Sequence, residues 1–173
     1  LEKYKKKAAS FEKRKNERVH PAYAGMIESL DDSVGRVLAA LKETGVVDDT
    51  VVIFTADNGG TSQQSSGGLR GAKALSYEGG TREPVLVKWP GKVKAGSKTA
   101  LPSYFPDWFP TLCSAAGAEL PAEQQLDGMD LTPVLQGGTA VPREELMIWD
   151  FRGYGGQIAI RDGKWKAVRQ KVL

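Results

Sequence analysis

Apolar residues between positions 20 and 45 recur at steps of three and four, which predicts one long amphipathic helix. His20-Pro21 marks the expected start, because the missing N–H of proline needs no partner in the first helical turn. Gly45 is expected to end the helix in a left-handed cap conformation. The apolar stripe consists of Tyr23, Met26, Ile27, Leu30, Val34, Val37, Leu38 and Leu41.

Two apolar runs, residues 50–55 and 84–89, show no alternation of polar and apolar positions. Such runs are typical of strands that are covered on both faces. A long amphipathic helix leads into the first of them, as in a β-α-β unit. We therefore expect an α/β fold with a mainly parallel sheet flanked by helices. Residues 59–68, rich in glycine and serine, predict a loop.

The C-terminal third has a different pattern. Residues 157–161 and 164–168 flank Asp162-Gly163, a dipeptide that favours a two-residue hairpin turn, and residues 146–151 form a further strand candidate. This pattern predicts a small antiparallel subdomain. Between the two sheets, Asp107 is expected to cap a short helix that ends at Gly117, and residues 127–138 are turn-rich with one helical turn.

The pattern divides the chain into three expected parts: a basic polar leader or helix over 1–20, an α/β part over 21–118, and an antiparallel part over 119–173. The leader holds eight Lys and Arg residues against three Glu, a net charge of +5, whereas the remaining residues carry a net charge of −2. Because basic character belongs to the leader rather than to a folded face, we expect no nucleic-acid partner.

Composition narrows the possible chemistry further. The single cysteine, Cys113, and the single histidine, His20, exclude a disulfide framework and any site built from several of either residue. Cys113 is expected to be a small buried residue on the short helix. No apolar run approaches the roughly 20 residues that a membrane span needs. The chain begins with Leu1 rather than Met, so we expect a fragment or a processed product.

The end of the first predicted strand carries the clearest chemical signal. Asp57 and Asn58 follow it after Ala56, and two glycines come next. In open α/β sheets, ligands bind beyond the carboxyl ends of the strands. Carboxylate and amide oxygens suit Ca²⁺ or Mg²⁺ rather than zinc. The alternative interpretation is a plain turn, for which Asp-Asn-Gly is equally suited.

A second segment offers fixed cations on a glycine-rich backbone. Arg70 and Lys73 lie within residues 67–73, and Arg82 follows another glycine pair. Flexible backbone and fixed cations suit a site for a tetrahedral oxyanion. Lys73 would act as a compact point charge on an anionic oxygen. Ordinary surface cations in a loop are the alternative.

Taken together, these segments resemble the sulfatase family, within the alkaline-phosphatase-like superfamily. The resemblance covers roughly residues 20–170 and is specific only as a combination of motifs. Its central motifs are Thr-Val-Val-Ile-Phe-Thr-Ala-Asp-Asn-Gly (50–59), Leu-Arg-Gly-Ala-Lys (69–73), Tyr-Glu-Gly-Gly-Thr-Arg-Glu-Pro (77–84) and Trp-Pro-Gly (89–91). Supporting matches lie at residues 23–31, 107–112, 127–131 and 159–166.

The resemblance implies roles for particular residues. Asp57 and Asn58 match the pair that binds Ca²⁺ at the sulfate site of the family, and Lys73 matches its sulfate-contacting lysine. Arg70 lies in the same motif and is a candidate for substrate binding. We expect Arg70, Glu78 and Arg82 to brace the loop by ion pairing.

The resemblance also implies what this chain lacks. The nucleophile of the family is a formylglycine made from a cysteine or serine in Cys-x-Pro-Ser-Arg or Cys-x-Ala-Ser-Arg, upstream of the Asp-Asn pair, and no match precedes Asp57. Cys113 lies downstream in a different context. We therefore expect part of a sulfatase that holds half a calcium site and is inactive alone.

Several alternatives remain open on the sequence. The chain could be a non-catalytic remnant that binds an anion or a partner, or part of a phosphodiester or phosphonate ester hydrolase of the same superfamily. For the full enzyme the resemblance implies a sulfated small molecule or polysaccharide as substrate and a periplasmic or secreted location. Exposed sheet edges in a partial sheet could also support self-association.

Overall fold

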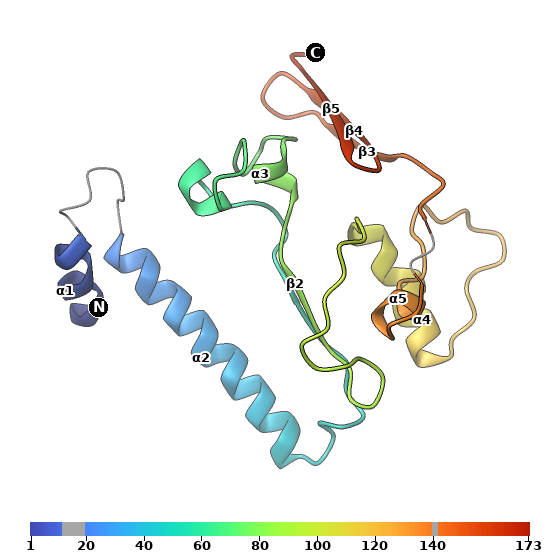
Figure 1. Ribbon diagram of the computed structural model, residues 1–173, viewed down its shortest axis with the longest axis horizontal. Coiled ribbons are helices and arrows are strands. Elements are labelled where there is room, and N and C mark those ends of the chain that lie inside the picture. The colour runs from blue at the N-terminus through green and yellow to red at the C-terminus, as the bar shows by residue number, and fades with distance from the viewer. Residues whose placement is uncertain (12–19, 140–141) are drawn as a thin grey trace. The chain divides into compact units, whose positions relative to one another are not determined.

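The computed structural model describes residues 1–11, 20–139 and 142–173 (Figure 1). The chain divides into two compact units, Leu1–Thr50 and Val51–Leu173, and each is described by itself. The boundaries expected after residues 20 and 118 stay predictions. None of the helices in the described ranges combines the length and the apolar character needed to cross a membrane.

The described part of the first unit holds two helices, α1 (Glu2–Phe11) and α2 (Pro21–Glu43). The predicted start of α2 is confirmed, since the Nδ1 atom of His20 accepts a hydrogen bond of 3.4 Å from the Tyr23 N–H. Gly45 follows the helix with a φ of +76°, as expected for its end. An exposed ion pair between Lys3 and Glu28 joins the two helices. Residues 12–19 of the predicted leader lie outside the described residues.

The apolar stripe of α2 is present, and in the described part of the chain most of it is exposed, with Val34, Leu38 and Leu41 half-buried. No residue of α2 is buried there, and the exposed fraction of Met26, the most open of the large apolar residues on α2, is 67%. Helices gain most of their stability from packing an apolar face. Within the described part of the first unit, packing of the apolar face therefore contributes little to the stability of α2.

The second unit begins with strand β1 (Val52–Thr55), which pairs with β2 (Val85–Lys88). The pairing is antiparallel, with Val52 opposite Lys88 and Thr55 opposite Val85. The mainly parallel sheet predicted from the sequence is therefore not found in the described residues. A parallel pair needs a crossover of a dozen or more residues, usually a helix. The chain between β1 and β2 instead holds only loops and two single-turn helices, and it re-enters from the end where β1 stops.

Five short helices connect the strands in the described residues of this unit. They are the 3₁₀ helix η1 (Gln63–Ser66), α3 (Glu78–Thr81), the 3₁₀ helix η2 (Phe105–Asp107), α4 (Trp108–Ala116) and α5 (Thr132–Leu135). The short helix expected near residue 108 is α4, and Gly117 ends it with a φ of +66°. Cys113 lies on α4 as a free, half-buried thiol.

Asp107 differs from its predicted role, since its side chain makes no capping hydrogen bond to α4. Its carboxylate is fully buried and accepts hydrogen bonds from the N–H groups of Tyr104, at 2.8 Å, and Met129, at 2.9 Å. The same carboxylate pairs with Arg143 at 2.6 Å. Asp107 therefore joins three separate chain segments.

The C-terminal antiparallel sheet predicted from the sequence is confirmed. It consists of β3 (Met147–Phe151), β4 (Gln157–Asp162) and β5 (Trp165–Gln170), in that spatial order. Both pairings are antiparallel, and the hairpin turn between β4 and β5 contains Gly163 with a φ of +51°.

Buried side chains in the described residues are unusually polar. The buried apolar ones are Leu131, Met147 and Ala159, and the buried polar ones are Ser76, Asp107, Thr111 and Gln157. Buried polar groups are costly unless they are hydrogen-bonded. Specific hydrogen bonds, rather than a large apolar core, therefore hold the loops of the second unit in place.

Candidate functional site

The candidate site starts where β1 ends. Asp57 and Asn58 follow Thr55 after one intervening residue, as the sequence predicts. The side chain of Asp57 is exposed and that of Asn58 is half-buried. Both oxygen-bearing groups therefore lie at the carboxyl end of the strand, within reach of solvent.

Backbone hydrogen bonds bring the Lys73 segment to this strand end. The Lys73 N–H donates to the Gly60 carbonyl at 2.8 Å, and the Gly59 N–H donates to the Gly80 carbonyl at 3.1 Å. Gly59 and Gly60 come directly after Asn58. The two segments that the sequence marks for cation and oxyanion binding are thus neighbours in space, while the convergence of their side chains stays a prediction.

Glycine is required where these segments meet. A Cβ atom built on Gly59 would lie 1.8 Å from the Gly79 carbonyl oxygen, and one on Gly80 would lie 2.0 Å from the Leu75 carbonyl oxygen. Both neighbours are backbone atoms, which cannot turn aside as a side chain can. The glycine pairs therefore serve close backbone packing rather than flexibility alone.

The cations of this segment have different surroundings. Lys73 is exposed. Arg70 lies over the ring of Tyr77, 4.1 Å from its centroid, and donates a hydrogen bond of 3.1 Å to the Tyr77 hydroxyl. The predicted bracing by Arg70 thus involves an aromatic ring, where a carboxylate was expected. Its predicted contact with substrate stays a prediction.

Glu78 braces the loop by ion pairing, as predicted, but its nearest partners lie in the C-terminal sheet. Its carboxylate lies 2.7 Å from Arg161 and 3.2 Å from Lys166, whereas Arg82, also expected to form ion pairs, is 3.9 Å away and largely exposed. Burial acts to raise the pKa of Glu78, but hydrogen bonds from Arg161 and Lys166 outweigh it and leave that pKa below its ordinary value. Burial lowers the pKa of Lys166 although Glu78 opposes that shift.

Glu83 adds a carboxylate that the sequence interpretation did not select. Its Oε1 atom is buried and has no hydrogen-bond partner in the described part of the chain. Burial, and after it the negative charge of Asp57, raise the pKa of Glu83. The two carboxylates are therefore close enough to repel each other.

The donor set fits part of a hard-cation site. Asp57 and Asn58 carry side-chain oxygens of the kind that such cations prefer, and the buried Oε1 atom of Glu83 lacks a hydrogen-bond partner within the described residues. No group of three or more His, Cys, Asp or Glu residues at metal-binding distance occurs in those residues. Calcium usually takes six to eight oxygen ligands, so the set here is incomplete.

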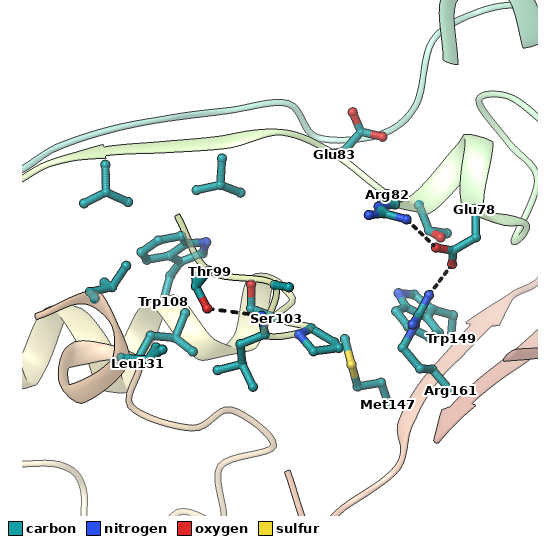
Figure 2. Close-up of a pocket in the computed structure, with 18 residues that line it drawn as sticks. Glu78, Arg82, Glu83, Thr99, Ser103, Trp108, Leu131, Met147, Trp149 and Arg161 are labelled. Atoms are coloured by element: carbon teal, nitrogen blue, oxygen red, sulfur yellow. Dashed lines mark hydrogen bonds and ion pairs between the residues drawn. The ribbon is translucent and has the colours of Figure 1, made fainter. Parts of the chain in front are cut away.

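Two cavities lie near these residues. The larger, of about 380 Å³, extends from Glu78, Arg82 and Arg161 at one end to Trp108 and Leu131 at the other (Figure 2), and none of the four predicted site residues lines it. The smaller, of about 250 Å³, is lined by Gly59, Gly60, Arg82 and Glu83, among others. The four predicted site residues do not line the smaller cavity either. We place the candidate site beside this cavity, because the chain that follows Asn58 forms part of its wall.

Sequence reasoning missed the residues of the C-terminal sheet that contact the loop. Gln157 and Arg161 alternate with Ile158 and Ile160 along β4, and the polar members take the less exposed side. Polar residues at the buried positions of a predicted strand were the sequence signal that could have identified Gln157 and Arg161. The partners of these two residues lie some 80 positions away in sequence and carry no local signature.

Comparison with known proteins covers both the sequence and the fold. The family model described as Sulfatase matches residues 1–118. Mouse (Mus musculus) steryl-sulfatase is 38% identical over 161 residues, which is 86% of this chain and 26% of that protein. Human (Homo sapiens) arylsulfatase A is 41% identical over 155 residues, which is 84% of this chain and 30% of that protein. The chain thus spans less than a third of these relatives.

Solved structures give the same result. Ps i-CgsB in complex with k-i-k-neocarrahexaose is 32% identical, with a TM-score of 0.79, over 95% of this chain and 37% of that one. BT4656, solved with its substrate D-glucosamine-2-N,6-O-disulfate, is 27% identical with a TM-score of 0.70, over 82% of this chain and 29% of that one. A phosphonate monoester hydrolase from Silicibacter pomeroyi is 25% identical, with a TM-score of 0.68, over 87% of this chain and 32% of that one. By its motifs, its relatives and its fold, this chain belongs to the sulfatase family.

Proposed function

We propose that this chain is part of a sulfatase that hydrolyses sulfate esters, to which it contributes half of a calcium site and a sulfate-contacting lysine. The observation that carries the proposal is the hydrogen bond from the Lys73 N–H to the Gly60 carbonyl. It joins the segment of the lysine to the turn that follows Asp57 and Asn58. This contact supports the proposal that the two segments belong to one site.

Each residue has a distinct part in the proposed chemistry. The Lys73 ammonium binds an oxygen of the sulfo group and compensates the charge that develops there during hydrolysis. Asp57 and Asn58 would hold the cation through their side-chain oxygens. A bound Ca²⁺ would supply Lewis-acid polarisation of the same group. Arg70, three positions before Lys73, is proposed to add a second positive charge toward the substrate.

Residues 1–173 alone are proposed to be inactive. Two protein ligands underfill a calcium site that needs six to eight oxygens, and no residue here matches the formylglycine segment. Calorimetric titration should give a dissociation constant weaker than about 1 µM, the range of the better calcium sensors. Submicromolar calcium affinity, or turnover of 4-nitrophenyl sulfate by the purified chain, would contradict this part of the proposal.

The substrate class is proposed to be a sulfated saccharide or a sulfated small molecule. Support comes from BT4656, whose substrate is a disulfated glucosamine. A periplasmic or secreted location and self-association through exposed sheet edges stay predictions.

Hydrolysis of phosphonate or phosphate esters is the second candidate, favoured by the similarity to a phosphonate monoester hydrolase. The test uses a longer chain that carries this sequence together with a formylglycine segment. We expect 4-nitrophenyl sulfate to be hydrolysed with a higher kcat/KM than phenylphosphonate or phosphate esters. Lys73→Ala should lower kcat for the sulfate by about 10²-fold or more, whereas Lys92→Ala, at an exposed lysine in a turn, should change it little. Preference for the phosphorus ester would reject the sulfatase proposal.

A further inference from the structure

Gln157, the first residue of β4, makes an unusual pair of contacts. Its side chain is 1% exposed. The carboxamide oxygen accepts the Ser76 N–H at 3.1 Å, and the carboxamide nitrogen donates to the Ala74 carbonyl at 2.9 Å. One side chain thus holds two backbone groups of the segment that directly follows Lys73.

The chemistry of glutamine suits this position. A carboxamide is both donor and acceptor, and the reversed orientation of the amide would face donor to donor and acceptor to acceptor. Burial of a polar side chain is costly unless its hydrogen bonds are made. An apolar residue at this inner position of β4 would pack without that requirement, but it would leave the Ser76 N–H and the Ala74 carbonyl without these partners.

The segment that Gln157 holds has a backbone that needs support. Ala74 has a φ of +70°, in the left-handed region that residues other than glycine rarely adopt. Such a conformation persists when the surroundings hold it in place. Ser76 is 3% exposed, so water cannot replace the contact from Gln157.

The same segment is held from both sides. On one side, the Lys73 N–H donates to the Gly60 carbonyl. On the other side, β4 supplies Gln157, and β4 and β5 supply the ion pairs from Arg161 and Lys166 to Glu78. Lys73 therefore lies between the turn after Asn58 and the C-terminal sheet.

We propose that Gln157 is a positioning residue that fixes the Lys73 segment, so that the C-terminal sheet sets where the lysine presents its charge. The role of that charge rests on the proposed function, in which Lys73 binds the sulfo group. Gln157 itself touches no substrate in this proposal, and it acts through the backbone of Ala74 and Ser76.

The test measures hydrogen exchange and sulfate binding in the full 173-residue chain. Gln157→Met keeps the length of the side chain and removes both hydrogen bonds. We expect the Ser76 amide to exchange about tenfold faster or more, with the amides of the β4–β5 ladder unchanged. Inorganic sulfate, followed by the NMR signal of the Lys73 side chain, should bind about tenfold more weakly.

Gln170→Met is the matched control. Gln170 lies opposite Gln157 on β5 and is exposed, so its replacement should alter neither readout. Unchanged Ser76 exchange in a folded Gln157→Met chain would overturn the proposal, and so would unchanged sulfate affinity where the wild type binds sulfate through Lys73.

A second variant covers the case in which Gln157→Met opens the sheet. Gln157→Glu keeps an acceptor for the Ser76 N–H but, when ionised, has no donor for the Ala74 carbonyl. In Gln157→Glu, slow exchange of the Ser76 amide together with weakened sulfate binding supports the positioning role. A sulfate affinity equal to that of the wild type overturns it. If the wild-type chain binds no sulfate through Lys73, the proposed function fails, while Ser76 exchange in these variants still decides whether Gln157 holds the segment.

Discussion

Removal of the Asp107 carboxylate is a substitution for which the structure predicts a large loss of stability. The carboxylate is fully buried and accepts hydrogen bonds from two backbone N–H groups and from Arg143, whose side chain is 12% exposed. Asp107→Ala would leave the guanidinium buried without its counter-charge. It would also leave the Tyr104 and Met129 N–H groups without their acceptor.

The magnitude follows from these contacts. Breaking a buried ion pair by removing one partner costs about 3–5 kcal/mol. Each unsatisfied backbone group costs about 1–3 kcal/mol, although such costs are not additive within one network. We expect Asp107→Ala to lower the free energy of unfolding by about 4 kcal/mol, a large part of the roughly 5–15 kcal/mol of a typical domain.

Urea denaturation followed by tryptophan fluorescence measures this difference. Asp150→Asn is the control, because Asp150 forms a 3.4 Å pair with Arg152 in which both side chains are at least half exposed, and such pairs contribute about 0–1 kcal/mol. In the double variant with Arg143→Met, part of the loss should be recovered, since no unpaired charge remains. A loss below about 1 kcal/mol for Asp107→Ala, at an unchanged m-value, would refute the reasoning.

Two further predictions concern the loop and its charge. Gly80→Ala should disrupt the loop and weaken sulfate binding, because its Cβ would lie 2.0 Å from the Leu75 carbonyl oxygen. Gly25→Ala, inside α2 with open space around it, should instead stabilise the chain by about 0.5–1 kcal/mol. Equal effects of the two variants on the melting temperature would contradict this contrast. The folded-state pKa of Glu78 lies below its unfolded value, so its contribution to stability is fully present above the unfolded pKa and is lost as the pH falls through the folded one. Stability measured between about pH 5 and pH 3 should therefore fall less steeply in Glu78→Gln than in the wild type, and identical slopes would count against the ion pairs.

Local sequence signals predicted the elements that depend on neighbouring residues. The α2 helix follows from apolar spacing together with its start at His20, and the β4–β5 hairpin follows from the turn preference of Asp162-Gly163. In each case the decisive interactions join residues only a few positions apart. The predicted mainly parallel sheet is not found, because the direction of β2 relative to β1 depends on the path of the 29 residues between them.

Long-range partners explain what the sequence did not reveal at the site. Glu78 was correctly expected to form ion pairs, yet its close partners Arg161 and Lys166 lie more than 80 positions away. Asp107 has the position of a helix cap, but its buried carboxylate instead pairs with Arg143 and accepts a hydrogen bond from the Met129 N–H. The motifs around Asp57 and Lys73 were selected from residue type, and the structure adds the backbone contact that joins them.

The central claim is that Asp57, Asn58 and Lys73 form one pocket for a cation and a sulfo group. An NMR titration of the chain with inorganic sulfate, in the presence of calcium, tests it directly. The account predicts that the Lys73 ammonium and Asn58 carboxamide signals shift along one common binding curve. It also predicts that the Asn58 shift disappears in Lys73→Ala, and that both shifts persist in Lys92→Ala. Signals that follow separate curves, or a Lys73 signal that does not move, would contradict the claim.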